Sequence, residues 1–115
     1  MKLKENEVLL FTSDKLGEGE NELGEILMKS FIHVLSESSE IAETVIFYNS
    51  GVKLTVNDSP SYEDLKMLEN SGAELLICGT CADYYDIKEK VSVGKISNMR
   101  VIVQKLQEAK KVLKP

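Results

Sequence analysis

Short apolar runs alternate with longer stretches of helical periodicity along this chain. Residues 8–12, 45–48 and 75–78 are apolar at nearly every position. Runs of this kind are typical of strands in a parallel sheet, because helices cover both faces of such a sheet. Two shorter runs, at residues 93–96 and Lys111–Leu113, are expected to form outer strands.

Helical patterns fill the intervals between these runs. We expect helices at residues 20–37, 61–71 and 98–109. Ser59 is expected to cap the second helix, with Pro60 at its first helical position, and Asn98 to cap the third. The alternation predicts an α/β fold, a three-layer sandwich in which a mostly parallel sheet of about five strands lies between helices.

The helix at 20–37 is apolar over roughly two-thirds of its circumference, far more than the stripe that a surface helix needs. Its apolar positions are Leu23, Ile26, Leu27, Met28, Phe31, Ile32, Val34 and Leu35. One sheet cannot cover all of them. A helix buried deep under neighbouring elements is one explanation, but we favour a subunit interface, because exposed apolar patches mark partners. His33, at the edge of the polar arc, is expected to be solvated or interfacial.

Composition narrows the possible functions. The chain has 115 residues, 43% hydrophobic and 29% charged, which is typical of an ordinary globular protein, and we expect a single domain over residues 1–115. Its net charge of -5 and its single arginine, Arg100, argue against a nucleic-acid surface. It has no run long enough to span a membrane and no signal-peptide pattern, so we predict a cytoplasmic protein.

Both cysteines lie in the run Cys78-Gly79-Thr80-Cys81, directly after the third apolar strand. In open parallel sheets, functional residues gather at the carboxyl ends of strands. Three segments meet at that edge, residues 13–19, 49–59 and 79–86. Because a reducing compartment disfavours structural disulfides, the pair indicates catalytic, redox or metal-binding chemistry.

The two thiols are expected to be unequal. If a helix begins near Ala82, Cys81 lies at its N-terminus, where free amides and the helix dipole favour the nucleophilic thiolate. Gly79 permits a tight turn and close backbone approach, and Thr80 is expected to donate a hydrogen bond to the sulfur. Cys78, the last residue of the strand, is expected to be half-buried.

Nearby charges and aromatic rings leave alternatives open. Asp83 would raise the pKa of Cys81, unless Lys88 and Lys90 fold back to offset its charge. Tyr84 and Tyr85 either wall a pocket or simply pack, and packing is the simpler expectation.

Three other interpretations of the cysteine pair remain. A zinc site normally takes four ligands, and two cysteines with one histidine cannot complete a Cys/His set, so we expect neither metal nor cofactor. A thioredoxin-like exchanger is conceivable, although neither Pro60 nor Pro115 corresponds to the proline that usually flanks such a site. The pair can also be two inert thiols at a strand end.

Three segments match a known family when they are taken together. They are Leu16-Gly17-Glu18-Gly19 with Glu22-Leu23-Gly24, Cys78-Gly79-Thr80-Cys81 with Asp83-Tyr84-Tyr85, and Ile96-Ser97-Asn98-Met99. In combination they resemble the DsrE-like domain of YedF-type proteins, in the DsrE/DsrF-like family, over nearly the whole chain. Two departures stand out: the TusA-like segment that often precedes the domain in YedF-type proteins is not among these 115 residues, and Asp86 stands where a glycine is expected after the tyrosine pair.

The resemblance implies a sulfur relay, in which loop Cys81 accepts sulfane sulfur as a persulfide and passes it on, with Cys78 as a helper. It also implies a homo-oligomer, a trimer or hexamer, consistent with the apolar helix 20–37, and a TusA-like sulfur-carrier partner. Such a carrier is not strictly an enzyme, and its cargo can be sulfur or selenium. The alternatives are a noncatalytic assembly or regulatory module with an inert cysteine pair, and a thiol-disulfide redox protein.

Overall fold

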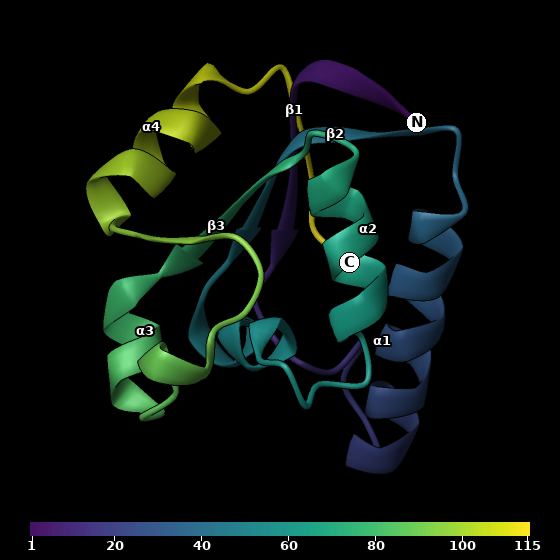
Figure 1. The fold of residues 1–115 in the computed structure, drawn as a ribbon, viewed down its shortest axis with the longest axis vertical. Coiled ribbons are helices and arrows are strands. Elements are labelled where there is room, and N and C mark those ends of the chain that lie inside the picture. Colours follow the sequence, from purple (N-terminus) through teal and green to yellow (C-terminus); the bar gives the residue numbers. More distant parts are fainter.

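Five parallel strands form one sheet in the order β4-β3-β2-β1-β5 (Figure 1). The computed structural model describes residues 1–115. The strands are β1 (Lys2–Phe11), β2 (Glu40–Phe47), β3 (Glu74–Cys78), β4 (Lys95–Ser97) and β5 (Lys111–Leu113). The predicted α/β fold with a parallel sheet is therefore confirmed.

Helices cover both faces of this sheet. Helices α1 (Asn21–Ser36) and α2 (Tyr62–Asn70) lie on one face, and α4 (Met99–Glu108) lies on the other (Figure 1). Helix α3 (Gly79–Tyr84) and the 3-10 segments η1 (Asn49–Thr55) and η2 (Lys88–Lys90) are short and follow the strands. They place α3 and η1 at the carboxyl edge of the sheet.

Strand β1 is twice as long as its apolar pattern predicts. Its first half is polar and largely exposed, and it pairs with β2 through the backbone, from Lys2 opposite Glu40 to Lys4 opposite Ala42. The register then shifts before Val8. Backbone pairing alone builds this half of the strand, and a hydrophobic pattern carries no signal for it.

The two predicted helix caps have different outcomes. The side chain of Asn98 accepts a hydrogen bond from the Val101 N–H at 3.0 Å, which confirms it as the cap of α4. The cap predicted for α2 is wrong, because the Ser59 hydroxyl accepts from the Ser61 N–H at 3.1 Å and closes a turn before the helix. Pro60 lies outside α2, and Ser61 is the N-cap.

Stacked aromatic rings anchor the ends of β1 and β2. The rings of Phe11 and Phe47 stack with centroids 5.3 Å apart, and Phe31 of α1 meets Phe11 edge-on at 6.0 Å. Phe11 and Phe47 are 1% and 0% exposed. This packing fixes the point at which the two strands end and the functional loops begin.

Helix α1 leaves a wide apolar face in solvent. Met28 and Ile32 are buried against the sheet, as a helix covering one face requires. Four other apolar side chains are 42–60% exposed: Leu23, Ile26, Leu27 and Val34. We call these four the α1 apolar face, and nothing within the chain covers it.

Helix α1 also contacts its neighbour α2 through polar side chains. The Nδ1 of His33 lies 3.2 Å from a carboxylate oxygen of Asp64, and its side chain remains 58% exposed. His33 is thus solvated, as expected.

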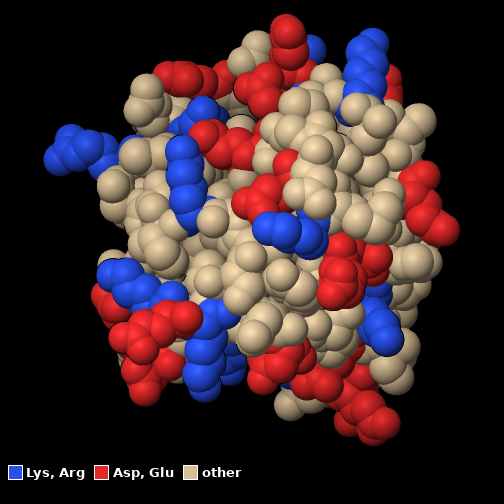
Figure 2. All heavy atoms as spheres, viewed as in Figure 1, with Lys and Arg blue, Asp and Glu red and all other residues tan.

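Charged side chains of both signs are interspersed over the surface in Figure 2, and no basic tract dominates this view. None of the helices combines the length and the apolar composition that crossing a lipid bilayer requires.

Candidate functional site

Strand β3 passes directly into α3 at the cysteine pair. Helix α3 begins at Gly79, three residues before the predicted start near Ala82, so Cys81 lies within its first turn. A side chain on Gly79 would approach Ile96 and the Ser97 carbonyl to 3.1 Å. Glycine at this position therefore lets β3 and α3 lie close to β4 and Ser97.

An open hollow of ≈ 380 Å³ lies over Cys81. It is lined by Asn49, Thr80, Cys81, Tyr84 and Tyr85, and we call it the Cys81 hollow. Four of these five residues come from the sequence prediction, and Asn49 does not. The two other predicted residues, Gly79 and Cys78, lie outside the hollow. Cys78 is 2% exposed, so the expectation that it is half-buried was wrong.

The tyrosine pair forms one wall of this hollow. Tyr84 is 82% exposed, and its ring meets that of Tyr85 edge-on with centroids 5.2 Å apart. The expectation that both rings simply pack was therefore wrong for Tyr84, because a packed ring would be largely covered. An exposed aromatic ring beside a thiol offers an apolar contact to an incoming molecule.

Asn49, at the carboxyl end of β2, is the residue that contacts the sulfur. Its backbone N–H donates a hydrogen bond to Sγ of Cys81 at 3.1 Å. Its φ of 52° is in the left-handed region, which asparagine tolerates better than most residues. The predicted donor, Thr80, is exposed and makes no hydrogen bond to the sulfur.

The side chain of Asn49 ties the same wall together. Its Oδ1 accepts from the Ser50 N–H at 2.9 Å and from the Tyr85 hydroxyl at 3.4 Å. The ammonium of Lys53 lies 4.4 Å from the centre of the Tyr85 ring, a cation–π contact. Segment η1 therefore positions two residues, Asn49 and Lys53, that sequence reasoning missed.

A signal for Asn49 was present in the sequence. It stands in the predicted loop 49–59, which was expected at the same sheet edge as the cysteines. The left-handed turn that aims its N–H at another loop is a tertiary feature, and periodicity carries no information about it.

Burial raises the pKa of the Cys81 thiol above its ordinary value, and the neighbouring Cys78 thiol raises it further. The hydrogen bond from the Asn49 N–H works in the opposite direction but does not outweigh them. The sequence left two opposing expectations open, a pKa lowered by the helix N-terminus and a pKa raised by Asp83, and the pKa is raised. The cause differs from the expected one, because Asp83 is 64% exposed and pairs with Lys88 at 3.5 Å.

Asp86 has the conformation that a glycine would adopt with ease. Its φ is 56°, in the left-handed region. A glycine expected at this position and an aspartate found there are therefore compatible with one loop geometry, since Asp is among the residues that tolerate this region.

Side chains that could hold a metal ion do not gather here or elsewhere. No group of three or more His, Cys, Asp and Glu side chains lies close enough to coordinate one.

Comparisons with known proteins show which family and which structures this chain is similar to. A sequence model of the DsrE/DsrF-like family matches residues 21–115. No functionally curated protein matches the chain by sequence.

Solved structures share the fold at low sequence identity. The YchN protein from E. coli is 15% identical, with a TM-score of 0.69 and 100% of both chains covered. MTH1491 from Methanobacterium thermoautotrophicum, a protein of unknown function, is 19% identical, with a TM-score of 0.67 and 100% of both chains covered. BT1422 from Bacteroides thetaiotaomicron, also of unknown function, is 13% identical, with a TM-score of 0.60 over 96% of this chain and 95% of that one.

Proposed function

The chain belongs to the DsrE/DsrF-like family, and we propose that it carries sulfur as a persulfide on Cys81. The observation that carries this proposal is the Cys81 hollow, in which a thiol at the end of a central strand is open to solvent beside a backbone N–H donor. Its partner thiol, Cys78, is buried, so only Cys81 can meet another protein without rearrangement.

Loading is a sulfur-transfer step between two thiols. The Cys81 thiolate attacks the outer sulfur of a donor persulfide, a new S–S bond forms, and the donor's inner sulfur leaves as its thiolate. Cys81 then holds the outer sulfur as a persulfide. Delivery repeats the step with an acceptor thiolate as the attacker and Cys81 as the leaving thiolate.

The surroundings of Cys81 support both steps in part. The Cys81 sulfur carries negative charge when it attacks the donor and again when it leaves on delivery, and the Asn49 N–H stabilises that charge through its hydrogen bond. The raised pKa means that only a small fraction of Cys81 is thiolate at neutral pH. We infer that the free protein is a slow nucleophile whose loading rate increases with pH.

Cys78 has a separate role in this proposal. The buried thiol can attack the Cys81 inner sulfur, forming a Cys78–Cys81 disulfide and expelling the outer sulfur as hydrogen sulfide. In this step the outer sulfur is reduced and the two cysteine sulfurs are oxidised. The step empties a carrier that finds no acceptor.

A sulfur carrier needs a donor and an acceptor of sulfane sulfur. We propose a TusA-like sulfur-carrier protein or domain as donor or acceptor, in the reducing cytoplasm. We further propose a homo-oligomer, a trimer or hexamer, assembled through the α1 apolar face. The cargo is sulfur in the first instance, and selenium is the variant to test beside it.

The raised pKa of Cys81 favours one other candidate, a noncatalytic assembly or regulatory module with an inert thiol. Transfer to an acceptor separates the two functions. The protein is incubated with a donor carrying ³⁵S in its outer sulfur, is freed of the donor, and is then mixed with an acceptor thiol. A carrier releases the label to the acceptor, and an inert module never acquires it.

A further inference from the structure

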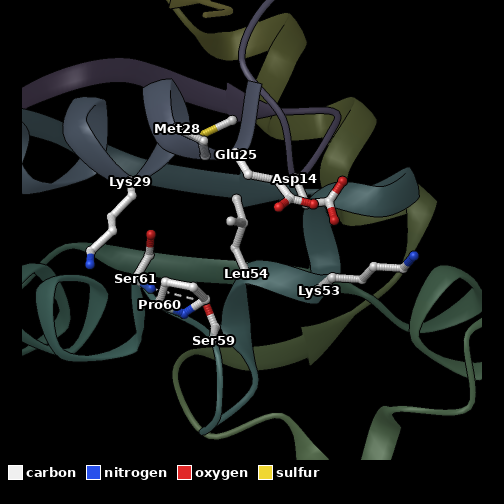
Figure 3. Close-up of a pocket in the computed structure, with 9 residues that line it drawn as sticks. All are labelled: Asp14, Glu25, Met28, Lys29, Lys53, Leu54, Ser59, Pro60 and Ser61. Atoms are coloured by element: carbon white, nitrogen blue, oxygen red, sulfur yellow. Dashed lines mark hydrogen bonds between the residues drawn. The ribbon is translucent and has the colours of Figure 1, made fainter. Parts of the chain in front are cut away.

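A second hollow, of ≈ 210 Å³, lies between α1, η1 and residues 59–61 (Figure 3). We call it the Ser61 hollow. It is smaller than the about 300–1,000 Å³ that drug-sized ligands occupy, so it has room only for a small molecule. None of the residues proposed for sulfur transfer lines it.

Ser61 is a largely buried polar residue whose hydroxyl finds no hydrogen-bond partner within the chain and is not fully sequestered, because it reaches the Ser61 hollow. It is 1% exposed and occupies the N-cap of α2, a position whose hydroxyl usually accepts from the helix N–H groups. Here the hydroxyl makes no capping bond, and in Figure 3 it points into the hollow on the side of Lys29. The Ser61 hydroxyl is therefore left to bind something else, whereas the Tyr62 N–H at the start of α2 already donates to the Ser59 carbonyl at 3.1 Å.

Opposite charges line different parts of the hollow. Lys29 of α1 lies at the end near Ser61, whereas the carboxylates of Asp14 and Glu25 lie toward the other end, with Lys53 beyond them (Figure 3). Two lysines and two carboxylates line the hollow, so their charges cancel. A simple anion would meet two carboxylates, and a simple cation would meet two lysines.

Two of these four charged groups have no charged or aromatic partner within the chain and keep the capacity to bind a ligand. Asp14 pairs with Lys15 at 3.1 Å, and Lys53 lies over the Tyr85 ring. Lys29 and Glu25 take part in none of the chain's ion pairs, although the two residues lie four positions apart on α1. In Figure 3 their side chains point away from one another.

The remaining charges around the start of α2 do not alter this arrangement. Glu63 and Asp64 are in its first turn, where carboxylates favour the helix dipole. The carboxylate of Asp64 is turned to His33 and Ser36.

We propose that the Ser61 hollow binds a free α-amino acid. Its carboxylate would accept from the Ser61 hydroxyl and face Lys29, and its ammonium would face Glu25 and Asp14. Apolar atoms of Met28 and Leu54 form the floor and leave room for a small side chain.

Titration of the ¹⁵N-labelled full chain, followed by amide chemical shifts, tests this site. The probes are L-alanine, propionate and ethylamine, because propionate is alanine without its ammonium and ethylamine is alanine without its carboxylate. L-alanine is expected to shift the amides of residues 61–64 and of Glu25 and Lys29 in a saturable way. Each half-molecule is expected to bind at least about tenfold more weakly, since it leaves one end of the hollow unpaired.

Variants separate the two ends of the site. Lys29→Gln and Glu25→Gln, both at exposed positions, are expected to weaken L-alanine binding by about tenfold, and Lys110→Gln, which does not line the hollow, to leave it unchanged. Ser61→Ala is expected to weaken it further, and its spectrum reports directly whether α2 stays folded. The absence of saturable shifts, equal binding of propionate, or equal affinity in all variants would overturn the proposal.

Discussion

The backbone N–H of Asn49 donates a hydrogen bond to Sγ of Cys81 at 3.1 Å, across the carboxyl ends of β2 and β3. The two residues are 32 positions apart in the sequence, and the order of the strands makes them neighbours. This contact is the one interaction within the chain that favours the charged form of the sulfur.

Replacing Asn49 tests the contact. Asn49→Val places a β-branched residue at a φ of 52°, which strains the turn and moves its N–H away from the sulfur. We expect the pKa of Cys81 to rise further and its alkylation at neutral pH to slow several-fold. Asn49→Gly is the matched control, because glycine keeps both the φ and the N–H. Equal rates for the two variants would show that the hydrogen bond has no influence on Cys81.

The pH dependence of Cys81 alkylation tests the raised pKa. Burial and Cys78 both raise it, so the rate is expected to keep increasing with pH beyond the 9.0 of an ordinary thiol. Cys78→Ala removes the second cause and is expected to move the profile to lower pH. A wild-type profile with its midpoint below 9.0 contradicts the raised pKa.

The same shift has a consequence for stability. A raised folded-state pKa means that folding favours the thiol form, so the stability contributed by Cys81 is present below the unfolded-state pKa and is lost as pH rises through the folded value. The wild type is expected to lose stability relative to Cys81→Ser above about pH 9, so the difference between their free energies of unfolding decreases there. Chemical denaturation at a series of pH values measures this difference.

The α1 apolar face is expected to bury against other copies of the chain. Ile26→Glu together with Val34→Glu places two charges on that face and is expected to dissociate the assembly, as measured by light scattering after gel filtration. Val103→Glu, at a 42% exposed position on α4, is the control and is expected to leave the assembly intact. A wild type that stays monomeric at every concentration excludes this role for the face.

Gly51 fixes η1, and with it Asn49, against β1. A side chain at Gly51 would collide with the Phe11 carbonyl, which is backbone and cannot move aside. Gly51→Ala is expected to lower the free energy of unfolding by about 1–3 kcal/mol and to slow Cys81 alkylation. Gly19→Ala is the control, because nothing lies within 4 Å of its added methyl group. An equal effect of both substitutions on stability would refute the clash.

The layers of the fold could be predicted because they depend on periodicity. The buried strand segments, helix 20–37 and the Asn98 cap each carry a local pattern, and each was found close to its predicted position. The polar half of β1 could not be predicted, since backbone pairing with β2 builds it. The start of α3 was missed because Gly79, a weak helix former, is held there by contact with Ile96 and Ser97.

The candidate site was predictable in its chemistry and not in its electrostatics. The cysteine motif and the strand-end rule identify Cys81 and the tyrosines, all of which share one loop. The sign of the Cys81 pKa shift depends on how far the thiol is buried and on Cys78 beside it, and neither can be derived from residue spacing. Asn49 belongs to another strand end, so only the folded chain brings it to the sulfur.

Intact-mass measurement after incubation with a persulfide donor tests the central claim most directly. The wild type is expected to gain about 32 Da, the mass of one sulfur atom, which a reductant removes. Cys78→Ala is expected to gain the same mass and to retain it longer, since the resolving thiol is gone. Cys81→Ala is expected to gain nothing. A wild type that never gains this mass, or a Cys81→Ala variant that gains it equally, would contradict the proposal that Cys81 carries sulfur.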